Sequence, residues 1–150
     1  MRVLLQRVSF ASVEIDGKIK SSIGNGMLVF VGIEEGDDAE DVEWLAGKIS
    51  RLRIFNDDAG TMNLSIQEIN GEFLIISQFT LHALVKKGNR PSYIKAARPE
   101  IAIPVYEDFL KALTLSSGLK VSSGEFGADM KINLLNEGPV TIFIDSKNKE

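Results

Sequence analysis

The chain has 150 residues, enough for one domain that buries about two-thirds of the surface its unfolded form exposes. Hydrophobic residues make up 44% and charged residues 25%, which are ordinary globular values and indicate neither a disordered nor a fibrous protein. The absence of cysteine excludes disulfides and thiolate chemistry, and the net charge of -4 argues against nucleic-acid binding through the whole surface.

No targeting segment is expected. Polar side chains occur too early in Met1–Arg7 for a secretory signal, and no apolar run approaches the ~20 residues of a membrane span. We therefore expect one soluble, intracellular domain, residues 1–150, with no membrane partner.

The N-terminal part is predicted to be a β-meander. Arg2–Ser9 and Ala11–Ile15 are rich in β-formers, and Asp16-Gly17 is a strong signal for a two-residue hairpin turn. After the turn Gly24-Asn25-Gly26, the stretch Met27–Ile33 is apolar on both faces, which is typical of a central strand.

Two helices are predicted. The first follows Gly36-Asp37-Asp38, with an Asp cap, acids in its first turn and an apolar stripe of Val42, Leu45, Ile49 and Leu52. The second begins near Pro104 and carries inward Val105, Phe109, Ala112 and Leu113.

Two further hairpins are predicted. Ser65–Ile69 pairs with Glu72–Ile76 through Asn70-Gly71, and a terminal hairpin over residues 130–145 turns at Asn136-Glu137-Gly138-Pro139. The Gly-Pro bond there can be trans or cis. The predicted fold is an α/β domain whose mixed, largely antiparallel, barrel-like sheet is covered by two main helices.

A candidate site lies at the end of the apolar run Phe73–Ile76, which is predicted to be a strand buried on both faces. If the strand continues, Gln78, Thr80 and His82 share one face. Hydroxyls and an amide at the end of a buried strand are typical of a site; alternatively, Gln78 and Thr80 are strand-edge residues satisfied by neighbouring backbone.

A basic run follows the candidate site. Five cations fall within the thirteen residues 86–98, which contain no Asp or Glu but include Tyr93: Lys86, Lys87, Arg90, Lys95 and Arg98. The run is either a phosphate-contacting surface or a solvated loop.

The residue inventory limits the chemistry. His82 is the only histidine, so neither a metal site nor a cofactor is expected, and a lone strand-end histidine is more often a surface or hydrogen-bonding residue than a catalytic base. What remains is hydrolysis of a reactive ester, with backbone N–H groups binding the oxyanion and water or a substrate hydroxyl supplying the rest.

Three ordered motifs are specific: Ser77-Gln78-Phe79-Thr80-Leu81, Lys87–Ser92 and Asn136–Thr141. They resemble D-aminoacyl-tRNA deacylases, also called D-tyrosyl-tRNA deacylases. The resemblance runs the full length and includes Gln6–Ser9, Lys48–Phe55, Met62-Asn63 and Phe126–Ala128.

This resemblance implies a deacylase-like fold and a cytoplasmic, homodimeric ester hydrolase that removes D-amino acids from tRNA. Its Gly138-Pro139 pair is implied to be cis and to enter the partner's pocket, where it holds the α-amino group and excludes L side chains. Glycine has no side chain to reject, so glycyl-tRNA mischarged on tRNA-Ala is an expected substrate.

The residues expected to act are catalytic Thr80, Phe79 and Gln78; substrate-binding Gly138, Pro139, Ser77, Met130 and Arg7; and tRNA-binding Lys86, Lys87, Arg90, Tyr93 and Lys95. Thr80 is a candidate nucleophile, but we favour water assisted by the terminal ribose hydroxyl. Two alternatives stay open: a related deacylase that tolerates some L-aminoacyl-tRNA, and a non-catalytic nucleic-acid-binding module.

Overall fold

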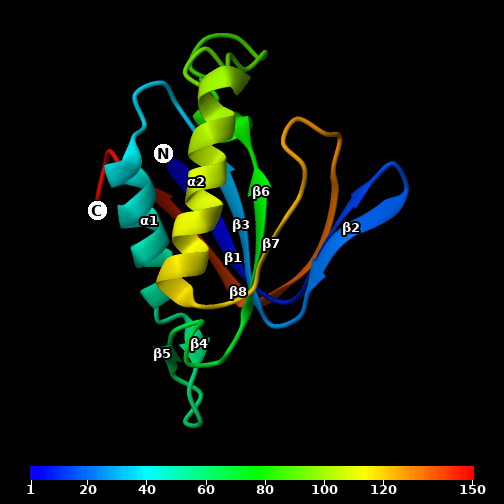
Figure 1. The fold of residues 1–150 in the computed structure, drawn as a ribbon, viewed down its shortest axis with the longest axis vertical. Helices are drawn as coiled ribbons and strands as arrows, with labels where there is room; N and C mark the ends of the chain where they lie inside the picture. Colours follow the sequence, from blue (N-terminus) through cyan, green and yellow to red (C-terminus); the bar gives the residue numbers. More distant parts are fainter.

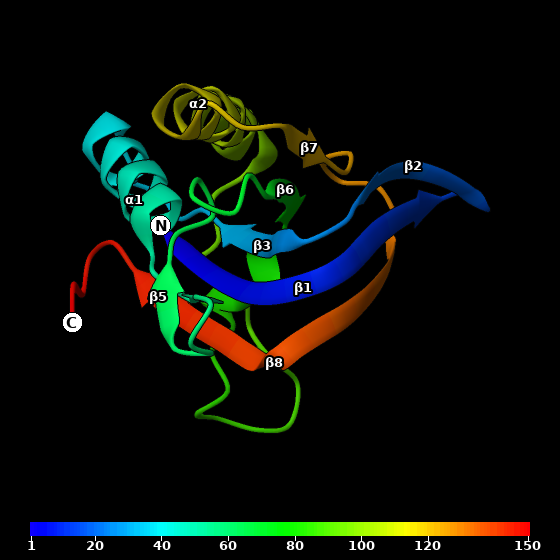
Figure 2. The ribbon, with the colours of Figure 1, turned by 90° about the horizontal axis from the view of Figure 1, so that it is seen from below.

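Strand β1 (Arg2–Ile15) pairs with three other strands and organises the sheet of this computed structural model, which describes residues 1–150. Antiparallel β3 (Gly26–Gly32) pairs with its first half and β2 (Lys18–Ile23) with its second half, while β8 (Lys131–Asp145) runs along its whole length (Figure 2). The predicted Asp16-Gly17 hairpin between β1 and β2 is confirmed, with φ positive at both residues.

Beyond β3 the sheet becomes parallel. Strand β6 (Glu72–Ser77) runs parallel to β3, and β7 (Val121–Ser123) runs parallel to β6. Strand β6 lies between two strands and its Phe73–Ile76 run is buried, so it is the strand buried on both faces that the sequence predicted.

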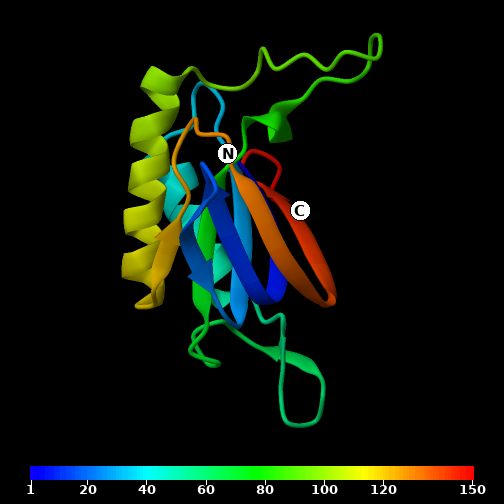
Figure 3. The same cartoon turned by 90° about the vertical axis from the view of Figure 1, so that its right-hand side faces the viewer.

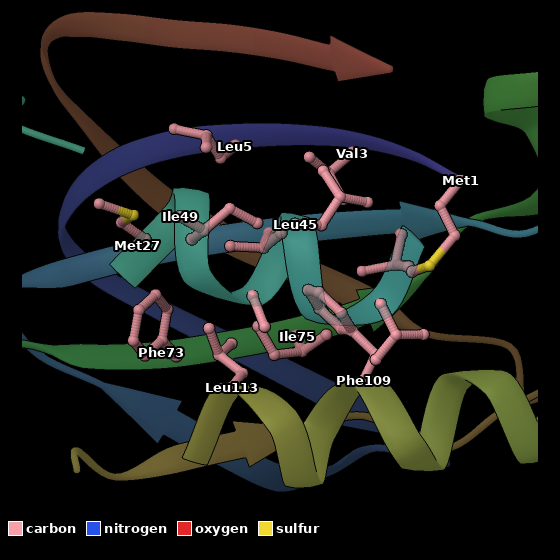
Figure 4. Close-up of a cluster of buried hydrophobic side chains, with 14 of the residues drawn as sticks. Met1, Val3, Leu5, Met27, Leu45, Ile49, Phe73, Ile75, Phe109 and Leu113 are labelled. Carbon is pink, nitrogen blue, oxygen red and sulfur yellow. The ribbon is translucent and has the colours of Figure 1, made fainter. Parts of the chain in front are cut away.

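Helices α1 (Ala39–Arg51) and α2 (Pro99–Ser117) cover one face of the sheet (Figure 1). Their apolar stripes meet the sheet in one core, where Leu45 and Ile49 of α1 lie opposite Phe109 and Leu113 of α2 with Ile75 of β6 between them (Figure 4). Burying such side chains contributes roughly 1.5–3 kcal/mol each, so this layer dominates the stability of the fold.

The predicted α/β class with two main helices is confirmed, but α2 begins five residues before Pro104. Pro99 occupies the first turn of α2, where a missing N–H costs nothing, and Pro104 lies inside the helix. Pro104 lacks an N–H, so one intrahelical hydrogen bond near the start of α2 is missing. Burial of Phe109 and Leu113 outweighs the loss of this bond.

The predicted hairpin between Ser65–Ile69 and Glu72–Ile76 is wrong. Glu68 accepts hydrogen bonds from the Ser65 amide at 2.7 Å and its hydroxyl at 2.8 Å, which closes a local turn in place of a strand. A separate two-stranded sheet forms instead from β4 (Phe55–Asn56) and β5 (Met62–Leu64).

The predicted terminal hairpin is also wrong, since both halves of β8 run antiparallel to β1 in one continuous strand. Gln6 pairs with Thr141 and Val8 with Asn136, so five steps along β8 span two along β1 and the residues between bulge outward. The Asn136 side chain closes this bulge: it donates to the Val140 carbonyl at 3.2 Å and accepts from the Val140 N–H at 3.1 Å.

The first half of β8 curls over the face of the sheet opposite the helices (Figure 3), where Ile132 and Leu134 pack on a second core cluster around Leu28, Leu74 and Ile76. The sheet is therefore nearly closed, as the barrel-like prediction required. Neither helix combines the length and apolarity that crossing a membrane requires.

The N-terminus of α1 is held by a short polar network. Asp38 caps the helix, the buried Asp41 accepts from the Asp38 N–H at 3.1 Å, and Lys147 donates to Asp41 at 2.5 Å. Burial raises the pKa of Asp41, but the hydrogen bonds from Lys147 and Asp38 outweigh burial and lower that pKa from 3.8 to about 2.

Asp41→Asn is therefore expected to lower the free energy of unfolding by about 1–2 kcal/mol at pH 6, discounted because Lys147 is half exposed. Because the pKa of Asp41 is lower in the folded state, the stabilisation is present above pH 4 and lost as the pH falls through 2. Urea unfolding at pH 6 and pH 2.5 checks this, with exposed Glu43→Gln as the unaffected control.

Candidate active site

Strand β6 ends at Ser77, and a 3₁₀ turn, Phe79–His82, follows it. The last ladder bond runs from the Gln78 N–H to the Val31 carbonyl at 2.7 Å, just before β3 ends at Gly32. With no further partner strand, the chain turns, and the Leu81 N–H bonds to the Gln78 carbonyl. The strand therefore does not continue to His82, and Gln78, Thr80 and His82 do not share a strand face.

A cavity of about 260 Å³ opens where β3 and β6 end. Its walls are mainly apolar, and it is lined by Val31, Ile33, Ile76, Ser77, Gln78, Phe79, Phe126, Gly127, Ala128, Met130 and Ile132. The structure thus brings together four of the predicted site residues, Ser77, Gln78, Phe79 and Met130. Apolar walls with few polar groups are typical of a small-ligand site.

Thr80 does not line this cavity but is held beside it. The Gln78 side chain donates from Nε2 to the Thr80 hydroxyl at 2.7 Å. The two side chains therefore bond to each other, and the alternative in which neighbouring backbone satisfies both is wrong.

The 3₁₀ turn presents main-chain donors at its start. The N–H groups of Phe79 and Thr80 precede the first bonded N–H of the turn, and no side chain caps it. Donors of this kind can stabilise negative charge that develops on a carbonyl oxygen beside Phe79.

Gly138 and Pro139 lie on the bulge of β8, where both are exposed and the peptide bond between them is cis. The buried Arg7 braces the bulge by donating to the Glu137 carbonyl at 2.9 Å and to the Ile54 carbonyl at 2.7 Å. Gly138 has φ +125°, and a Cβ there would lie 2.5 Å from Nη2 of Arg7, so this position requires glycine.

Within one chain, the bulge and the cavity lie at different ends of the sheet. The bulge is level with Arg7 and its partner Met27, whereas the cavity begins at Val31, four residues or roughly 13 Å farther along β3. Gly138, Pro139 and Arg7 are therefore not brought together with Ser77, Gln78, Phe79 and Met130.

The basic loop, residues 83–98, follows the 3₁₀ turn and extends away from the sheet (Figure 3). Leu84 and Ser92 pair across it, and the exposed Lys86, Lys87, Arg90 and Lys95 form no ion pair. The Tyr93 ring packs edge-to-face on Phe79, with centroids 5.0 Å apart. This contact joins the loop to the rim of the cavity.

The sequence did not single out Tyr106 of α2, which supports the cavity from behind. Its hydroxyl donates to the Ile75 carbonyl at 2.9 Å, its ring packs against Phe126, and burial raises its pKa. The motif Phe126–Ala128, noted only as part of the resemblance, supplies one wall of the cavity. The position of this motif shortly before Met130, a predicted substrate-binding residue, was the sequence signal that could have placed it at the site.

His82 is fully buried and has no hydrogen-bond partner in the protein, so the expected surface or hydrogen-bonding role is wrong. Nδ1 of His82 lies 4.0 Å from Oε2 of Glu34. Neither ring nitrogen forms a hydrogen bond with the Thr80 hydroxyl, so His82 is not placed to act as its base.

Comparison with known proteins gives a consistent result. The family model described as D-Tyr-tRNA(Tyr) deacylase matches residues 4–145. Proteins named D-aminoacyl-tRNA deacylase from Bacteroides thetaiotaomicron and Bacteroides fragilis are 63% and 65% identical to the chain, each over 150 residues that cover 100% of both proteins.

Two solved structures are similar. One, a c-Myc DNA unwinding element binding protein, has a TM-score of 0.91 and 38% identity and covers 97% of this chain and 98% of that chain. The other, described as a probable eukaryotic D-amino acid tRNA deacylase, has a TM-score of 0.81 at 20% identity, covering 95% and 97%, and supports the fold alone.

Proposed function

Because this chain belongs to the D-Tyr-tRNA(Tyr) deacylase family, we propose that it hydrolyses the ester joining a D-amino acid to tRNA and releases both. The observation that carries the proposal is the cavity at the end of β6, lined by Ser77, Gln78 and Phe79 beside the unbonded N–H groups of the 3₁₀ turn. An activated ester needs a placed carbonyl and an oxyanion site rather than a strong base.

The bond-breaking step is proposed to use water. Water adds to the acyl carbon while the N–H groups of Phe79 and Thr80 bind the oxyanion; the ester C–O bond then breaks, and the water proton passes through the terminal ribose hydroxyl to the leaving oxygen. The Thr80 hydroxyl is a poor nucleophile here, because it is fixed by Gln78 and no base contacts it.

The Gly138-Pro139 bulge is proposed as the chiral filter. Its main-chain oxygens would hold the α-amino group of the substrate and leave no space for a side chain in the L configuration. D-amino acids and glycine then pass, so glycyl-tRNA mischarged on tRNA-Ala is a second proposed substrate. The rigid brace from Arg7 supports this role, because a filter works only if the bulge cannot yield.

A second copy of the chain is proposed to complete the site, since each bulge lies roughly 13 Å along the sheet from its own cavity. On the face away from the helices, Leu4 pairs with Phe143 on one side and Phe30 on the other, and Phe143 is 52% exposed. Such an apolar row suits a self-complementary dimer interface that would carry the bulge into the partner's cavity.

The basic loop is proposed to contact the acceptor end of tRNA. Lys86, Lys87, Arg90 and Lys95 would neutralise phosphates, and Tyr93, already packed on Phe79, would stack a terminal base. Contact confined to the acceptor end implies action on many tRNAs, in the cytoplasm where aminoacyl-tRNA is used.

A non-catalytic nucleic-acid-binding role is the second candidate, favoured by the 38% identity to a DNA unwinding element binding protein. The net charge of -4 limits such binding to the loop. A deacylase that tolerates L-aminoacyl-tRNA is the remaining alternative, and it differs from the main proposal only in the filter.

Release of amino acid from matched D- and L-aminoacyl-tRNA separates these functions. The native protein is expected to cleave the D ester at least about 100-fold faster than the L ester. Gly138→Ala is expected to lower D cleavage at least tenfold or to admit the L ester, because its Cβ would displace Arg7 and the residue is strained at φ +125°.

Gly17→Ala is the matched control, because Gly17 also has positive φ but nothing lies within 4 Å of its Cβ position. Full exclusion of the L ester together with a native rate of D cleavage in Gly138→Ala would contradict a filter at this bulge. Binding of tRNA without release of either amino acid would support the non-catalytic role instead.

Thr80→Ala is expected to keep the rate of a single turnover within about tenfold of the native rate, because the hydroxyl orients Gln78 rather than attacking the ester. Rapid-quench measurement on D-aminoacyl-tRNA checks this. A loss of three orders of magnitude, with an unchanged circular dichroism spectrum, would give the hydroxyl a chemical role.

Phe143→Asp is expected to halve the mass in solution from a dimer of 16.5 kDa protomers and to lower D-aminoacyl-tRNA cleavage at least about 100-fold, since each cavity then lacks the partner's bulge. Sedimentation equilibrium gives the mass. Leu115→Asp, on the exposed side of α2, is expected to stay dimeric and active. A fully active monomer would contradict the shared site.

A further inference from the structure

His82 is a buried polar side chain that the proposed chemistry does not use. It ends the 3₁₀ turn that begins at Phe79, it is fully buried, and neither ring nitrogen has a hydrogen-bond partner in the protein. A neutral imidazole always carries one N–H donor. An unmade bond of this kind in a buried site is costly and calls for a functional explanation.

The nearest carboxylate is Glu34, whose Oε2 lies 4.0 Å from Nδ1 of His82. This distance is longer than a hydrogen bond but within reach of a small side-chain movement. Glu34 lies on the segment between β3 and α1 and is partly exposed, and no hydrogen bond within the protein holds its carboxylate. The His82 ring packs closely on Gly32 of β3, because a Cβ at that position would lie only 3.0 Å from the ring.

The pair lies where the two ends of the basic loop meet. His82 immediately precedes the loop, whereas the backbone of Glu34 pairs with Ala96 near its end, and the Ala97 N–H bonds to the Ile33 carbonyl at 2.9 Å. Arg2 of β1 already fixes the Leu81 carbonyl at 3.1 Å and is itself paired with Asp145. A bond from His82 to Glu34 would therefore join the start of the loop to its end.

We propose that His82 is a positioning residue. When an acceptor end binds to the basic loop, the ring N–H of His82 donates to Glu34, and this bond holds the two ends of the loop together beside Phe79 and Thr80. This bond would give the buried ring N–H the acceptor that no protein group within hydrogen-bond distance supplies. This inference rests on the proposed function only for the identity of the ligand, an RNA with a single-stranded 3′ end.

Substitutions separate this role from a packing role because they move stability and affinity in different directions. His82→Phe fills the same space without an unmet donor, so its thermal midpoint is expected to match or exceed that of the native protein. Its KM for D-aminoacyl-tRNA is expected to rise about tenfold with kcat nearly unchanged, the size of one lost hydrogen bond to a charged group.

The conservative variant should restore binding. His82→Gln keeps an N–H donor and is expected to hold KM within about threefold of the native value. Glu34→Ala should raise KM as much as His82→Phe does, and the double variant should have a KM no higher than that of either single variant. Glu35→Ala, at the exposed neighbouring carboxylate, is the matched control and should leave KM unchanged.

Binding of an uncharged RNA hairpin that ends in CCA gives a readout independent of hydrolysis. His82→Phe and Glu34→Ala are each expected to weaken it about tenfold. Since His82 is the only histidine, nitrogen NMR assigns its ring directly, and a slowly exchanging ring N–H should be detected only when this RNA is added.

Unchanged KM and RNA affinity in His82→Phe would overturn the inference, and so would a lower thermal midpoint with normal affinity, the result expected if His82 only packs or bonds to a buried water. If these variants bind RNA more weakly but the native protein releases no amino acid, the proposed function is overturned and the role of His82 stands.

Discussion

The pairing of β6 with β3, and the point at which it stops, determines the rest of this structure. The Gln78 N–H makes the last ladder bond to Val31, and one residue later β3 ends. The chain must turn there, because a strand without a partner would leave its backbone groups unmet. That turn opens the cavity and leaves the N–H groups of Phe79 and Thr80 free to bind a ligand.

A site of this kind depends on main-chain position rather than on titratable side chains. The charged group that matters most, Arg7, is buried and donates only to neutral oxygens, including the carbonyl of Glu137 next to the Gly138-Pro139 bulge. Its contribution is rigidity. The handedness of an amino acid can be distinguished by shape alone. A filter based on shape must move less than the distance that separates the D and L positions of the side chain.

The charge distribution fits a protein that touches RNA only locally. The acidic net charge keeps most of the surface from attracting phosphate, whereas the loop of residues 83–98 carries unpaired cations and reaches the cavity rim through the Tyr93–Phe79 contact. Such an arrangement favours the single-stranded end of a tRNA over its body. Under the proposed function, discrimination among tRNAs would be weak, and discrimination among amino acids would fall to the cavity and the Gly138-Pro139 bulge.

Apolar periodicity and turn chemistry by themselves determined the buried strands β3 and β6, the capped helix α1 and the Asp16-Gly17 hairpin, because these depend on neighbours in sequence. Only the tertiary structure decided the rest. Residues 65–76 and 130–145 have the alternation of side chains and the turn residues that are typical of hairpins. A strand, however, pairs with the partner that buries its apolar face, and β1 is that partner for both halves of β8. The separation of Gly138 from the cavity follows from that long-range register, and the burial of His82 follows from the packing of the 3₁₀ turn against Gly32 of β3. No local pattern encodes either.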